Sequence, residues 1–297
     1  MKLTTLQLLS GFVMILASCD RAHSADVGKE AKDGAVVLAQ KHFMPPAGTI
    51  ATKDATMTMT DAVIKMKAGE QEMAGTLTQT ETSKETREIL SADKFRSLLE
   101  SKTTHEKMKL NDQDQAAPEK SDALVGVPVI LERKDGKWSA SLEKEGEPSA
   151  EQQAALDKEA ASASRDSDFA MYGDTPRKPG DKWDVDPAKL MDFGDAEGLT
   201  GKYRVEFVEV KEVKGVRCAV LKATFDIKGK TKAEGDGPQM DIQLKGEAVS
   251  QRSIADKIDL NVEVNAKVTV SGSPTPEMSM HVEGPMRMTE KISLKKP

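Results

Sequence analysis

Apolar side chains recur at every second position through about the last hundred residues of the chain. Between residues 258 and 271 the apolar row is Ile258, Leu260, Val262, Val264, Ala266, Val268 and Val270, with Asp259, Asn261, Glu263, Asn265, Lys267, Thr269 and Ser271 in between. Similar rows lie at residues 203–207, 219–227, 240–248 and 278–288. One buried face and one wet face over successive long strands predict an antiparallel meander.

The same period of two begins at Thr49 in the first half of the chain. Lys67-Ala68-Gly69-Glu70 predicts a turn there, and Lys134-Asp135-Gly136-Lys137 predicts a hairpin. Residues 84–92 and 95–110 fit either a strand or a helix, and we favour strands. Long strands twist, so the fold class expected is mainly β: antiparallel meander sheets curled into half-barrel or clam-like halves, with one or two connecting helices.

The middle of the chain breaks this pattern. Ser149 with Gln152 forms a capping-box signal, and the alanine-rich residues 150–163 predict a helix. A polar stretch follows, and Asp186-Pro187 predicts a short helix through Met191. The expected segments are a signal peptide (1–18), a tether with weak helical character over 26–43 (19–47), an N-terminal β half (48–143), a helical linker (144–199) and a C-terminal β half (200–297).

The first twenty residues predict export. Lys2 precedes a short apolar run from Leu6 to Ala17, which is typical of a secretory signal. Leu16-Ala17-Ser18-Cys19 resembles the lipobox of bacterial lipoproteins, in which the cysteine sulfur accepts a diacylglyceryl group. The resemblance implies a lipidated Cys19, acyl chains such as palmitate holding the protein on a membrane of the bacterial cell envelope. The alternative is a soluble secreted or periplasmic protein, cleaved near Ala22-His23-Ser24.

Composition narrows the classes of function. The chain has 43 Lys+Arg and 49 Asp+Glu, a net charge of −6 spread evenly, which argues against a nucleic-acid partner. Two cysteines exclude a disulfide framework, and Cys218 is interpreted as a small buried residue. The sequence holds no nucleophile elbow, no phosphate-binding glycine loop and no zinc-protease motif, because His105-Glu106 lacks a second histidine. We therefore expect a protein that is not an enzyme and needs no cofactor, with a hydrolase of unrecognised site as an alternative.

Several short motifs resemble an uncharacterised β-rich family of bacterial envelope proteins. They are two strands rich in threonine and methionine, Leu124-Val125-Gly126, Asp135-Gly136-Lys137-Trp138 and Pro179-Gly180-Asp181-Lys182-Trp183, followed by the long meander. The resemblance covers most of residues 48–297. Because that family has no assigned activity, it implies architecture and compartment and transfers no catalytic residue.

Fifteen methionines include the pairs Met57/Met59, Met278/Met280 and Met286/Met288. On a strand, each pair projects to one side, where thioethers either fill an irregular core or bind Cu(I). A copper-binding periplasmic protein, with Met278, Met280, Met286 and Met288 as ligands, is thus an alternative function. The main expectation is a non-catalytic envelope lipoprotein that binds an apolar, lipid-like ligand or acts as an adaptor. The expected lining of a ligand site is Leu260, Val262, Val264, Met278, Met280, Met286 and Met288.

Overall fold

The computed structural model describes residues 34–115, 122–190, 196–231 and 239–297. Its main feature is a sheet of 12 strands, in which all neighbouring strands run antiparallel. The strands are β1 (Ile50–Ala68), β2 (Gln71–Ser91), β3 (Lys94–Leu110), β4 (Gln113–Gln115), β5 (Pro128–Lys134), β6 (Lys137–Leu142), β7 (Lys182–Val185), β8 (Ala196–Val213), β9 (Val216–Thr231), β10 (Met240–Ser253), β11 (Asp259–Thr275) and β12 (Met278–Lys295).

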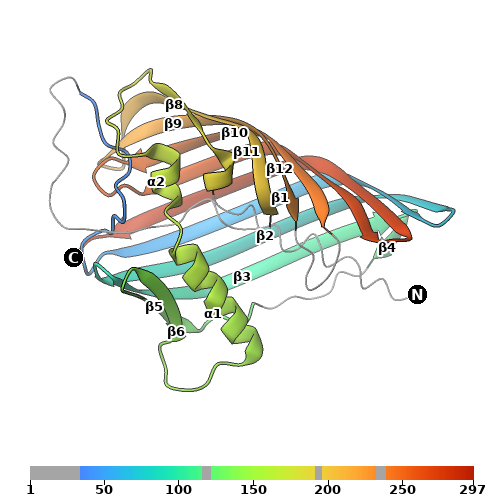
Figure 1. Ribbon diagram of the computed structural model, residues 1–297, viewed down its shortest axis with the longest axis horizontal. Helices are drawn as coiled ribbons and strands as arrows, with labels where there is room; N and C mark the ends of the chain where they lie inside the picture. The colour runs from blue at the N-terminus through green and yellow to red at the C-terminus, as the bar shows by residue number, and fades with distance from the viewer. Residues whose placement is uncertain (1–33, 116–121, 191–195, 232–238) are drawn as a thin grey trace.

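The sheet is continuous from one half of the chain to the other. Its order is β6-β5-β3-β2-β1-β12-β11-β10-β9-β8-β7, with β4 paired to β3. The two halves meet where β1 pairs with β12, from Ile50 opposite Lys295 to Ala68 opposite Met278. Figure 1 shows the long strands curling without closing into a barrel. The predicted fold class, mainly β with long antiparallel meanders and connecting helices, is confirmed.

A bulge in β1 explains a change of parity in its apolar row. Met57 and Met59 are buried at odd positions, whereas Ala62 and Ile64 are buried at even ones. The register against both neighbouring strands shifts just after Met59, and Asp61 there has φ 49°. The extra residue returns the apolar side chains to the same face of the sheet.

Two helices lie in front of the sheet in Figure 1. Helix α1 (Ala150–Ala163) begins at the predicted capping box, in which the Ser149 and Gln152 side chains each bind the other's backbone N–H. Helix α2 (Ser167–Tyr172), capped by Asp166, was not predicted. The predicted short helix after Asp186 is the 3₁₀ turn η2 (Pro187–Lys189), and Met191 lies outside the described residues.

Three apolar clusters stabilise the described fold. The largest joins the inward rows of β1, β2, β8–β12 with Tyr172 of α2 and Leu38. A second lies between α1 and strands β2, β3, β5 and β6, and includes Leu156 and Trp138. A third, at one end of the long strands, contains Cys218 and Leu260. We call the face that carries the largest cluster the inner face.

Two expectations differ from the structure in detail. Residues 84–92 belong to β2 as far as Ser91, so they continue a strand and do not form a separate one. The described part of the weakly helical stretch is not helical: Val36 forms a β-bridge with Arg177, and Leu38 is buried beneath the sheet's inner face. Packing against the sheet overrides a weak local helical pattern.

Candidate functional site on the inner face of the sheet

A seam of methionines follows the junction of the two halves. It consists of Met57, Met59, Met66, Met73, Met278, Met280, Met286 and Met288. Met57 lies opposite Met288, and Met59 lies opposite Met286. Met66 lies between Met73 on β2 and Met280 on β12. Side chains opposed in this way are in contact range. The seam therefore consists of two groups of thioethers, with Ala62, Ile64, Val282 and Gly284 between them in the inward rows.

Two residues of the predicted lining extend this seam onto β11. Val264 lies opposite Met288 and is 1% exposed, and Val262 is also buried in the same cluster. Leu260 lies elsewhere, in the cluster with Cys218 and Ile292 at the end of the strands. Cys218 is free and buried, as predicted.

Charged side chains cross the inner face beside the methionine seam. We call them the polar belt: Arg87 and Glu85 of β2, Lys53 of β1, Glu290 of β12, Asp259 of β11 and Arg252 of β10. These five strands are neighbours in the sheet, so the polar belt runs across them. Glu290 follows Met286 and Met288 in the same inward row, and Lys53 precedes Met57 in its row. Along β1 and β12 the inner face therefore changes from apolar to charged.

One end of the polar belt is a closed ion-pair group. Lys53 Nζ lies 2.9 Å from Glu85 Oε2, while Arg87 Nε and Ser97 Oγ donate to Glu85 Oε1. Burial acts to raise the pKa of Glu85, but Arg87 and Lys53 outweigh it and hold that pKa well below its usual range. Burial likewise opposes the charge on Lys53, yet Glu85 and Glu290 raise its pKa overall. These groups are ionised at neutral pH.

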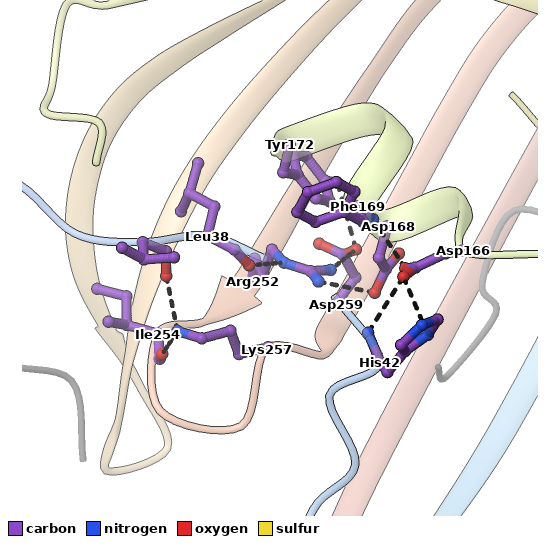
Figure 2. Close-up of polar contacts among 11 residues, drawn as sticks. Leu38, His42, Asp166, Asp168, Phe169, Tyr172, Arg252, Ile254, Lys257 and Asp259 are labelled. Carbon is purple, nitrogen blue, oxygen red and sulfur yellow. Dashed lines mark hydrogen bonds and ion pairs between the residues drawn. The ribbon is translucent and has the colours of Figure 1, made fainter. Parts of the chain in front are cut away.

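Arg252 forms the other end, shown in Figure 2. Its guanidinium is 1% exposed and donates to Asp259 Oδ2 at 2.6 Å, to Asp168 Oδ2 at 2.7 Å and to the Leu38 carbonyl at 2.8 Å. The ring of Tyr172 lies 4.3 Å from the guanidinium carbon. Burial disfavours the charge, but the two carboxylates raise the pKa of Arg252. Arg252 thus fixes α2 and the Leu38 segment onto the sheet.

Asp259 was expected on the wet face, and the structure places it inside. The register between β10 and β11 shifts between Gln251 and Arg252, and this irregularity puts Asp259 opposite Arg252. Asp259 Oδ2 also accepts a hydrogen bond from Tyr172 Oη at 3.3 Å. Its second oxygen, Oδ1, is buried and has no hydrogen-bond partner in the described structure.

Glu290 occupies the middle of the polar belt. It is 5% exposed, and its Oε1 is buried with no hydrogen bond from any described group. Burial raises the pKa of Glu290 to about 7; Lys53 acts in the opposite direction, while Asp259 and Glu85 reinforce the rise. Burying a carboxyl group that accepts no hydrogen bond lowers the stability of the folded state. Packing alone therefore does not account for a glutamate at this position.

A cavity of about 30 Å³ lies beneath α2, next to Asp259. Its lining is Met171, Tyr172, Tyr203, Val205, Leu221, Ala223, Ala248, Ser250, Asp259 and Val262. The cavity has room for a water-sized group, whereas ligand pockets for drug-sized molecules measure roughly 300–1,000 Å³. Most of its lining is apolar, with Asp259, Ser250 and the two tyrosines supplying the polar atoms.

Metal sites and membrane-spanning helices can be assessed within the described residues. There, no group of three or more His, Cys, Asp or Glu side chains could hold a metal ion. No helix in that part of the chain is both long and apolar enough to cross a bilayer. Cys19 and the rest of the predicted signal lie outside the described residues.

No protein-family model matches the sequence, and no curated protein matches it. Among solved structures, a lipovitellin chain studied for lipid–protein interactions has a TM-score of 0.39 and 9% identity, covering 84% of this chain. This chain spans 26% of that lipovitellin chain.

Two bacterial structures match with lower TM-scores. A DUF1329 family protein from Desulfovibrio piger ATCC 29098 matches with a TM-score of 0.17 and 11% sequence identity. The match covers 82% of this chain and 85% of that protein. The COG4313 outer membrane channel from Pseudomonas putida F1 matches with a TM-score of 0.23 and 7% sequence identity. The match covers 84% of this chain and 97% of that channel.

Proposed function

We propose that this protein is a non-catalytic lipoprotein of the cell envelope that binds an apolar, lipid-like ligand on the inner face of its sheet. The observation that carries the proposal is the methionine seam, an apolar strip that spans the junction of β1 and β12 and ends at charged residues. An amphipathic molecule has the same division, with an apolar chain and a polar end.

Methionine suits a site that must open around a chain. The described cavity is too small for a lipid tail, so binding requires inward side chains to move apart. Methionine is unbranched and flexible, and it changes conformation at low cost compared with Val or Ile. Met-rich surfaces elsewhere in proteins serve binding that tolerates varied ligands. The seam thus combines a dry surface with the capacity to repack.

Two neighbouring residues of β10 offer a matched test. Ala248 lines the cavity, whereas Val249 is 40% exposed on the opposite face. Ala248→Phe fills the space under α2 and so removes room for inward side chains to move apart when the site opens. It should reduce binding of the fluorescent apolar probe 1-N-phenylnaphthylamine at least tenfold, while Val249→Phe should leave it unchanged. Native mass spectrometry of the purified full chain should also find a co-purified lipid. The absence of both probe binding and bound lipid would overturn the proposal.

Attachment to the membrane rests on Cys19 and has its own test. Cys19→Ser removes the sulfur that would accept the diacylglyceryl group, so the variant should move from the membrane fraction to the soluble fraction. Ser18→Ala, which leaves the cysteine in place, is the control and should stay in the membrane fraction. If Cys19→Ser remained membrane-bound, another part of the chain would be the anchor.

The observed register of β1 against β12 also supports a second candidate function, Cu(I) binding. Met57, Met59, Met286 and Met288 form a block of four thioethers on two adjacent strands, a donor set that suits a soft cation. Met278 and Met280 lie farther along β12, opposite Ala68 and Met66. Titration of Cu(I) into the wild type and into the double variant Met286→Leu/Met288→Leu decides this function, because equal affinities would end it.

A further inference from the structure

The polar belt has an excess of acid that its own cations do not neutralise. Its cations are Arg87, Lys53 and Arg252. The carboxyl groups that face them are Glu85, Glu290 and Asp259 of the belt, together with Asp168 of α2 and Glu159 of α1. The carboxyl groups therefore outnumber the three cations.

The hydrogen bonds identify which oxygens remain. Glu85 forms ion pairs with both Arg87 and Lys53. Arg252 pairs with one oxygen of Asp168 and one oxygen of Asp259. Glu290 Oε1 and Asp259 Oδ1 are both buried and accept no hydrogen bond within the described structure. All three cations are engaged, whereas the atoms still lacking a partner are acceptors.

These acceptors lie beside the cavity. Asp259 lines it directly, and Glu290 lies opposite Val262, another lining residue. The rings of Tyr172 and Tyr203 form further walls, and tyrosine faces attract cations. The volume of about 30 Å³ admits a group the size of an ammonium ion.

We propose that this cavity receives the ammonium group of an amphipathic primary amine, with its apolar chain directed toward the methionine seam. This inference rests on the proposed function and specifies its ligand class. The ammonium group donates to Asp259 Oδ1 and Glu290 Oε1 and supplies the positive charge that the polar belt lacks. A carboxylate or phosphate head would instead face two carboxylates, which disfavours fatty acids at this site.

Binding is linked to the ionisation of Glu290. The charged groups that face Glu290 are Lys53 of β1, Glu85 and Arg87 of β2, and Asp259 of β11. Its pKa of about 7 in the unbound protein means that an incoming ammonium ion binds an ionised Glu290 and releases a proton from the protonated fraction. Affinity for the amine should therefore rise as pH increases through about 7.

The test compares four probes with a twelve-carbon chain by isothermal titration calorimetry on the purified full chain. Dodecylammonium should bind at least about tenfold more tightly than dodecanol, since hydrogen bonds to charged groups are stronger than hydrogen bonds between neutral groups. Dodecanoate should bind least. Dodecyltrimethylammonium should bind more weakly than dodecylammonium, because its head is too large for the cavity and donates no hydrogen bond.

Glu290→Gln provides the matched variant, and Glu263→Gln on the exposed face of β11 is its control. Glu290→Gln should lose the preference for dodecylammonium while keeping its affinity for dodecanol, whereas Glu263→Gln should behave as the wild type does. A second measurement needs no variant: wild-type affinity for dodecylammonium should increase from about pH 5.5 to pH 8.

The outcomes separate the two proposals. Equal binding of dodecylammonium, dodecanol and dodecanoate would overturn the ammonium site and leave apolar-ligand binding intact. Tightest binding of dodecanoate, or an amine affinity independent of pH and of Glu290, would overturn it as well. If none of the four probes bound, the proposed function itself would fail.

Discussion

The methionine seam and the polar belt occupy the same face of the sheet and share strands β1, β2 and β12, yet their side chains depend on their neighbours in different ways. In the seam, the inward positions of β1 and β12 are apolar, and only on the β2 side do Met57 and Met59 lie opposite buried polar residues, Glu81 and Gln79. In the polar belt, inward positions carry charges that depend on partners from other strands, such as Lys53 on Glu85 and Arg252 on Asp259. The seam tolerates exchange of similar residues, whereas the polar belt depends on specific pairs.

The largest expected effect is a charge placed within the apolar region. Val264→Asp puts a carboxylate opposite Met288 with no cation in the row, which should cost roughly 5 kcal/mol and unfold the sheet. Asn265→Asp, on the exposed face one residue later, should change stability by less than about 0.5 kcal/mol. Urea unfolding measures both, and equal effects would mean that the inner face is wrongly assigned.

Removal of Arg252 tests the polar belt. Arg252→Met leaves Asp168 and Asp259 buried without their cation, which should destabilise the protein by roughly 3–5 kcal/mol. Arg287→Met removes an arginine that pairs with Glu263 on the outer face, with both side chains about half exposed, and should cost less than about 1 kcal/mol. If the two variants were equally stable in thermal unfolding, Arg252 would not be the residue that fixes α2 and the Leu38 segment onto the sheet.

Glu290→Gln should make the protein more stable at high pH. The pKa of Glu290 is raised from 4.5 to about 7 in the folded state, so the folded protein binds a proton that the unfolded chain releases. The corresponding stability is complete below about pH 4.5 and is lost as pH rises through 7. Glu290→Gln should remove this loss, worth roughly 3 kcal/mol at pH 8. Unfolding of both proteins between about pH 5 and pH 8 checks the sign, and parallel profiles would contradict it.

The smallest effect is expected within the seam. Met286→Leu keeps an apolar side chain of similar volume opposite Met59, so stability should change by less than about 1.5 kcal/mol. Met286→Ala, which leaves a void at the same position, should cost roughly 2–5 kcal/mol. A large loss in the leucine variant would show that the thioether has a role beyond packing.

Sequence patterns predicted most of the strands because the alternation is local. The hairpin after Lys134 and the helix after Ser149 are encoded within a few residues, and both form as predicted. The pairing of β1 with β12 is not visible in any window of the sequence, because it joins the two ends of the described chain. The block of Met57, Met59, Met286 and Met288 was missed for the same reason.

The polar belt was missed because a charge in a strand normally indicates a wet face. Lys53 and Glu290 lie at inward positions of rows that are otherwise apolar, so a break in an apolar row was the available signal. Asp259 could not be placed from its parity, since the register shift beside Arg252 reverses it. Helix α2 has six residues, which is too short for a periodic pattern to reveal.

The junction of β1 and β12 also governs how the chain folds. Ile50 pairs with Lys295, so the hydrogen bonds between β1 and β12 cannot form until β12 has been synthesised. Until then β1 presents an open edge of unpaired backbone groups to other chains. Pairings between segments this distant slow folding, because the closure entropy must be met before the contacts form. The newly made chain therefore has a prolonged period in which aggregation competes with the native topology.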